Sequence, residues 1–126
     1  MEISTRQTGA ATIVDVVGDI TLFNSPQIRR VLLDLLKEKR VAQLLVNMKR
    51  VPYIDSSGIA SLVEGLKVSR DRNSRLALFG LSKMAREVLE LTRLTTVFEI
   101  HDTEEEAVNA AGPAGGLTGR VAGAIN

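Results

Sequence analysis

The run Asp55-Ser56-Ser57-Gly58 carries the side chains of this chain that are best suited to chemistry. It follows an apolar segment that predicts a buried strand and precedes residues 57–71, whose apolar spacing predicts an amphipathic helix. A hydroxyl at a helix start lies beside unpaired backbone N–H groups and the positive end of the helix dipole. Because that position can hold a phosphoryl group, Ser56 is predicted to be a serine that is acted upon.

Three kinds of active site are disfavoured by what the chain lacks. A serine hydrolase needs a base beside its nucleophile, but the single histidine, His101, lies far along the chain and no Gly-x-Ser-x-Gly elbow surrounds Ser56. One histidine and no cysteine make a metal site improbable. The glycine-rich phosphate-binding loop ending in Lys-Ser/Thr is also absent. We therefore expect no enzyme, no bound cofactor and no metal.

A purely structural role for Ser56 stays open at this point. Asp-Ser-Ser before a periodic apolar run is typical of a helix N-cap. In that role Ser56 accepts one N–H hydrogen bond, which contributes about 1 kcal/mol, and does nothing else. Three hydroxyl or carboxylate groups in a row exceed what one cap needs, which weakly favours a further role.

Composition sets the broad class of the protein. The 126 residues suit one domain, and the 44% hydrophobic and 25% charged fractions are ordinary for a soluble protein. A net charge of +1 gives no attraction to nucleic acid or to an anionic membrane. No apolar stretch has the length of a signal peptide or of a membrane span. We expect a soluble, cytoplasmic protein, and the small size and balanced charge favour a monomer.

The order of predicted elements is β-β-α-β-α-β-α-β-α. Residues 3–7 and 12–17 suggest an antiparallel hairpin, and the strand–helix alternation that follows predicts right-handed crossovers and a mixed, mostly parallel sheet. The fold class is therefore α/β, with helices expected on both faces, and partial cover of one face stays open. We predict a domain over residues 1–111 and a flexible glycine-rich tail over 112–126.

Several segments together resemble a known family. Residues 53–62 (Tyr-Ile-Asp-Ser-Ser-Gly-Ile-Ala-Ser-Leu), which follow Leu-Leu-Val-Asn-Met at 44–48, resemble the signature of bacterial anti-sigma factor antagonists of the STAS class. Gly-Asp-Ile at 18–20 is similar to the family's Gly-acidic-apolar motif, and 75–82 to its passage from a strand into the third helix. The resemblance covers about residues 3–111 in order and without large gaps.

The resemblance implies a partner-switching role in transcription regulation. Ser56, directly after the aspartate, is then the phosphoacceptor, and the partner is an anti-sigma factor with serine kinase activity that itself uses ATP. Phosphorylation releases that partner, and a serine phosphatase reverses the modification. The expected docking face is the helix start with the loop before the first helix; Gly58 is expected to let a partner backbone or nucleotide approach closely. The predicted partner-binding residues are Asp19, Thr21, Asn24, Ser25, Asp55, Ser57, Gly58 and Ile59.

Two features leave an alternative open. Thr21 stands where many members of the family carry an acidic residue. Related small domains also serve as non-switching accessory subunits, for example of a phospholipid-transport ATPase or a stress-signalling scaffold.

Overall fold

After an initial hairpin the chain alternates strands and helices in the order predicted from the sequence. The computed structural model describes residues 1–111, and the predicted tail lies outside them. The elements are β1 (Glu2–Thr8), β2 (Ala11–Val17), α1 (Ser25–Leu33), the π-helical turn η1 (Asp34–Glu38), β3 (Gln43–Arg50), α2 (Ser56–Asp71), β4 (Arg75–Phe79), α3 (Lys83–Leu91), β5 (Glu99–His101) and α4 (Glu104–Ala111).

The five strands lie side by side in chain order, β1-β2-β3-β4-β5. β1 and β2 are antiparallel, and the other neighbouring pairs are parallel, which confirms the mixed, mostly parallel sheet. Gly9 turns the hairpin at a φ of +60°, a conformation that glycine adopts at little cost. β3, β4 and β5 each join the sheet next to the strand that precedes them in the chain, so the sheet grows in one direction. Right-handed crossovers that all run in that direction place their helices on the same face of the sheet.

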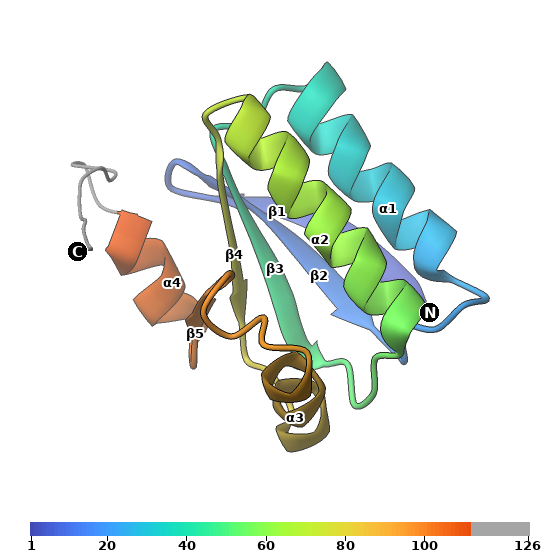
Figure 1. Ribbon diagram of the computed structural model, residues 1–126. Helices are drawn as coiled ribbons and strands as arrows, with labels where there is room; N and C mark the ends of the chain where they lie inside the picture. The colour runs from blue at the N-terminus through green and yellow to red at the C-terminus, as the bar shows by residue number, and fades with distance from the viewer. Residues whose placement is uncertain (112–126) are drawn as a thin grey trace.

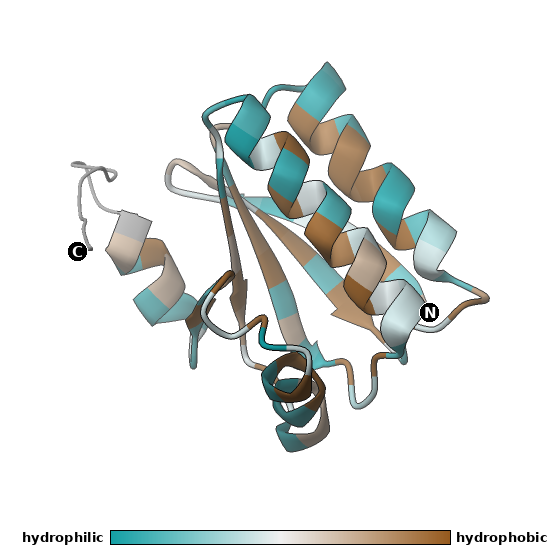
Figure 2. Cartoon of the chain, in the orientation of Figure 1, coloured by the Kyte–Doolittle hydropathy of each residue, from teal (hydrophilic) through white to brown (hydrophobic). Residues whose placement is uncertain are grey.

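The two faces of the sheet are covered unequally (Figures 1 and 2). α1 and α2 lie side by side over one face and, with α3, enclose the larger core, to which β3 contributes Leu44 and Val46. Among the described elements, α4 alone covers part of the other face, where Leu45 and Phe79 pack with Ala107. Alternate residues of β3 thus enter different cores, which explains the unbroken apolar run at 44–46.

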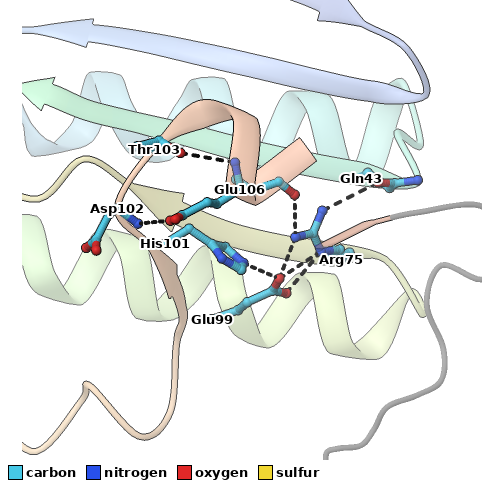
Figure 3. A network of polar contacts seen from close by, with 8 residues as sticks. Gln43, Arg75, Glu99, His101, Asp102, Thr103 and Glu106 are labelled. Carbon is cyan, nitrogen blue, oxygen red and sulfur yellow. Dashed lines mark hydrogen bonds and ion pairs between the residues drawn. The ribbon is translucent and has the colours of Figure 1, made fainter. Parts of the chain in front are cut away.

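Two arginines of the sheet fasten α4 to it. Arg6 of β1 donates to Glu104 with an N–O distance of 2.6 Å. On the other side Arg75 of β4 pairs with Glu99 and donates to the backbone carbonyl of Ala107 at 2.8 Å (Figure 3). The apolar contact of α4 with the sheet is small and centres on the fully buried Ala107. These polar contacts therefore add to the attachment of α4.

Two element ends have local causes. The first helix passes into η1, in which the Asp34 carbonyl accepts from the N–H of Lys39, and Arg40 follows at a φ of +54°. The last strand starts at Glu99, because Val97 donates its N–H to the Leu94 carbonyl at 3.0 Å and so belongs to a turn.

Candidate functional site

Ser56 lies at the edge of the sheet where the parallel strands end. β3 ends at Arg50, Val51 and Ile54 bury their side chains in the core, and α2 then begins at Ser56 itself. The Ser56 side chain is exposed, and its hydroxyl makes no hydrogen bond to any residue in the range 1–111. A group arriving from solvent can therefore reach this hydroxyl.

Asp55, rather than Ser56, caps α2. Its Oδ1 accepts a hydrogen bond from the backbone N–H of Gly58 at 3.0 Å, the contact expected of an N-cap side chain. Its Oδ2 accepts from the backbone N–H of Leu22 at 2.9 Å, in the loop between β2 and α1. The capping role that the sequence left open for Ser56 is thus filled by its neighbour, and the same carboxylate joins two loops.

The loop between β2 and α1 is held against this edge by backbone hydrogen bonds. Ile20 and Ile54 form an isolated parallel bridge. The N–H of Ile20 donates to the Tyr53 carbonyl, and the N–H of Asp55 donates to the Ile20 carbonyl, both at 3.0 Å. The two loops therefore form one surface with a fixed relative position.

Asn24 secures the loop from within. Its Oδ1 accepts from the backbone N–H of Thr21 at 2.7 Å, and its Nδ2 donates to the carbonyl of Asp19 at 2.8 Å. Although Asn24 stands at the N-cap position of α1, its side chain makes no cap hydrogen bond to that helix. A single amide thus connects Asp19, Thr21 and Asn24, three of the residues predicted to meet a partner.

The predicted site residues differ in exposure, and Gly58 has a different role from the one expected. Asp19 and Ser56 are exposed; Thr21, Asn24, Asp55 and Ser57 are half-buried; Ser25, Gly58 and Ile59 are buried. A Cβ on Gly58 would lie 2.6 Å from Ile54 Cγ1 and 2.7 Å from Ile20 Cγ2. Gly58 therefore lets α2 approach the core of its own chain, and its position does not open the site to a partner.

Sequence reasoning missed the exposed apolar side chains on the two loops next to Ser56. Leu22 is 65% exposed, Phe23 is 94% exposed and Tyr53 is 40% exposed. The available signal was the presence of two large apolar residues in a non-periodic turn, between the motif glycine Gly18 and Pro26. Loops that lack a functional role rarely place such side chains next to one another in water.

His101 belongs to a different polar network, on the α4 side of the sheet (Figure 3). Its Nε2 lies 2.7 Å from Glu99 Oε2, and Glu99 is also paired with Arg75, which reaches the backbone of α4. Burial raises the pKa of Glu99, but the hydrogen bonds from Arg75 and His101 outweigh burial and hold that pKa below its usual range. Ser56 begins α2 on the opposite face, so the histidine is not positioned to act on its hydroxyl.

Two kinds of feature are absent from residues 1–111. No group of three or more histidine, cysteine, aspartate or glutamate side chains could hold a metal ion in this part of the chain. No helix there combines the length and the apolar character needed to cross a membrane.

The five-stranded mixed sheet with helices stacked mainly on one face is that of a single STAS domain. The chain belongs to the STAS domain family, whose model matches residues 2–107, and the predicted family is thereby confirmed. It is 33% identical over 106 residues to the anti-sigma-B factor antagonist of Listeria monocytogenes, a match that covers 84% of this chain and 91% of that protein.

Solved structures share the fold. An anti-sigma factor antagonist from Mycobacterium paratuberculosis has a TM-score of 0.79 at 16% identity, over 86% of this chain and 92% of that one. The anti-sigma factor antagonist SpoIIAA of Bacillus matches with a TM-score of 0.69 in its phosphorylated form, at 21% identity over 87% and 99% of the two chains. Its unphosphorylated form has the same TM-score of 0.69, at 20% identity over 89% and 99%.

Proposed function

We propose that this protein is an anti-sigma factor antagonist that is switched by phosphorylation of Ser56. In the unphosphorylated state it binds an anti-sigma factor with serine kinase activity, in the cytoplasm. The partner uses ATP to phosphorylate Ser56, the complex then separates, and a serine phosphatase restores the hydroxyl. The observation that carries the proposal is the exposed Ser56 hydroxyl, which is released from capping because Asp55 fills that role.

The helix start offers a phosphoryl group a place without disturbing the fold. Among residues 1–111 the backbone N–H groups of Ser56 and Ser57 have no carbonyl partner, and unpaired N–H groups at a helix start bind anions. SpoIIAA matches this chain equally well in its two phosphorylation states, which supports a switch that keeps the fold.

Loss of binding follows from charge and desolvation. A phosphoryl group adds a charge of about −1.5 to −2 at neutral pH. It would stand next to the Asp55 carboxylate, on a surface that meets the partner while Ser56 is neutral. A partner group that fits a hydroxyl must then face repulsion and the cost of removing water from a dianion; about 1.4 kcal/mol already lowers affinity tenfold. A non-switching accessory subunit has no need for such a free hydroxyl, so the geometry favours the switch.

Mass spectrometry of the intact protein tests this function. The chain is incubated with ATP and each purified anti-sigma-factor-like ATPase of the same genome, and one of them is expected to add about 80 Da, the mass of one phosphoryl group. Ser56→Ala should gain no mass, whereas the matched control Ser57→Ala should still be modified. No mass gain on the wild-type chain, or a gain that persists in Ser56→Ala, contradicts the proposal.

A phosphomimetic variant tests the release step separately. Ser56→Asp should keep the circular dichroism spectrum and the melting temperature of the wild-type chain but bind the kinase more weakly. Equal affinity of Ser56→Asp and Ser56→Asn for the kinase would show that negative charge at this position does not control binding.

A further inference from the structure

The surroundings of Ser56 hold half of the aromatic side chains of the protein. The chain has only three phenylalanines and one tyrosine. Phe79 and Phe98 are buried in the core, with 0% and 4% exposure. Phe23 and Tyr53 are 94% and 40% exposed and lie on the two loops beside Ser56, together with Leu22. Exposed aromatic side chains at this frequency indicate a contact surface.

The backbone of these three residues is held in place by the hydrogen bonds of the site. The backbone N–H of Leu22 donates to Asp55 Oδ2, and that of Phe23 donates to Thr21 Oγ1 at 3.3 Å. The carbonyl of Tyr53 accepts from Ile20. Because the backbone of these loops is already ordered, the loops lose less conformational entropy when a partner binds this surface.

We propose that Leu22, Phe23 and Tyr53 form an apolar anchor that inserts into an uncharged, apolar pocket of the ATP-using partner. This inference rests on the proposed function and adds which residues give the complex its affinity. Large aromatic side chains that become fully desolvated contribute most to such interfaces. Asp55 holds Leu22 and the start of α2 together, so a partner seated on the anchor is placed over the Ser56 hydroxyl.

The position of the anchor identifies its occupant. Leu22 and Tyr53 lie on the loops that are hydrogen-bonded to Asp55 and Ile20, next to Ser56, so a protein bound there covers the hydroxyl. A second copy of this chain seated on the anchor would shield Ser56 and bring no phosphoryl donor. A partner that both covers and modifies Ser56 must carry the ATP itself. Binding should therefore depend on the anchor, and phosphoryl transfer on Ser56.

The experiment compares leucines in matched settings. Leu22→Ala removes an exposed leucine of the anchor, whereas Leu91→Ala removes one that is 84% exposed at the far end of α3. The start of α3 lies at the edge of the site, because the hydroxyl of its N-cap residue Ser82 donates to the Pro52 carbonyl at 3.0 Å. The nine residues of α3 then rise by about 13 Å, which carries Leu91 away from that edge. Leu91 therefore serves as the control for loss of exposed apolar surface.

Steady-state phosphorylation by the ATPase that modifies the wild-type chain gives the readout. Leu22→Ala and Phe23→Ala should each raise KM for this chain by about tenfold or more, and leave kcat within about twofold. Leu91→Ala should leave both constants within about twofold of the wild-type values. Binding should also change little between low and high salt, because an apolar contact is not screened.

The possible results separate the two proposals. If Leu22→Ala and Phe23→Ala match Leu91→Ala while Ser56 still gains phosphate, the anchor is refuted and the switch stands. A kcat that falls with KM unchanged also refutes the anchor, because these residues then position the hydroxyl and do not bind. If no ATPase modifies the wild-type chain, the switch itself is wrong and the anchor, which depends on it, is rejected too.

Discussion

Replacing Gly58 by alanine tests whether this glycine serves the core under the site. The new Cβ would lie 2.6 Å from Ile54 Cγ1, 2.7 Å from Ile20 Cγ2 and 3.0 Å from the Ile20 carbonyl oxygen. Both isoleucines are buried and stiff at χ1. Overpacking of this kind costs about 1–3 kcal/mol, and a contact that includes backbone places the cost at the upper end. Alanine also favours the helix over glycine by about 1 kcal/mol, which offsets part of this cost. We therefore expect Gly58→Ala to lower the free energy of unfolding by about 2 kcal/mol.

Gly65→Ala, in the same helix, is the matched control. Its Cβ would meet Leu32 Cδ1 at 3.1 Å, the flexible end of a side chain, and no backbone atom is among the near contacts. The gain in helix propensity is the same, so stability should stay within about 1 kcal/mol of wild type. Urea unfolding with an unchanged m-value should place the midpoint of Gly58→Ala clearly below that of Gly65→Ala. Equal midpoints for the two variants would refute the packing role of Gly58.

Two further predictions concern the hydrogen bonds of carboxylates. Asp55→Ala removes the acceptor of both the Gly58 and the Leu22 N–H groups, so we expect a loss of about 1–2 kcal/mol in chemical denaturation and faster amide exchange at Leu22. Unchanged exchange at Leu22 would show that the loop does not depend on this carboxylate. Hydrogen bonds from Arg6 hold the pKa of Asp15 and of Glu104 below their usual range. A lowered folded-state pKa stabilises the protein above the unfolded value, about 4, and that stability is lost as pH falls through the folded value. The free energy of unfolding should therefore decrease on acidification below about pH 4.5. The decrease should be less steep in Arg6→Met than in the control Arg30→Met. Identical slopes in the two variants would contradict the role of Arg6 in lowering these pKa values.

Much of the fold could be predicted because its signals are local. The hairpin follows from β-branched residues on either side of Gly9, and α3 begins after Ser82, whose hydroxyl accepts from the N–H of Ala85 as a cap should. The apolar segment ahead of Asp55 correctly predicted a buried strand, which is β3. The sequence did not predict that three helices would share one face, because that depends on the order in which strands join the sheet.

Within the site, the sequence by itself determined that an aspartate and two serines open an amphipathic helix after a buried strand. Only the tertiary structure decided which of these residues caps the helix and which hydroxyl stays free. Asp55 became the cap and the link to Leu22, Ser56 was left free, and Gly58 turned toward Ile20. The physical reason is distance along the chain: Asp55 and Leu22 are 33 residues apart, and Arg6 and Glu104 are 98 apart. Local patterns of residue type set helices and strands, but contacts between remote segments form only when the sheet brings its edges together.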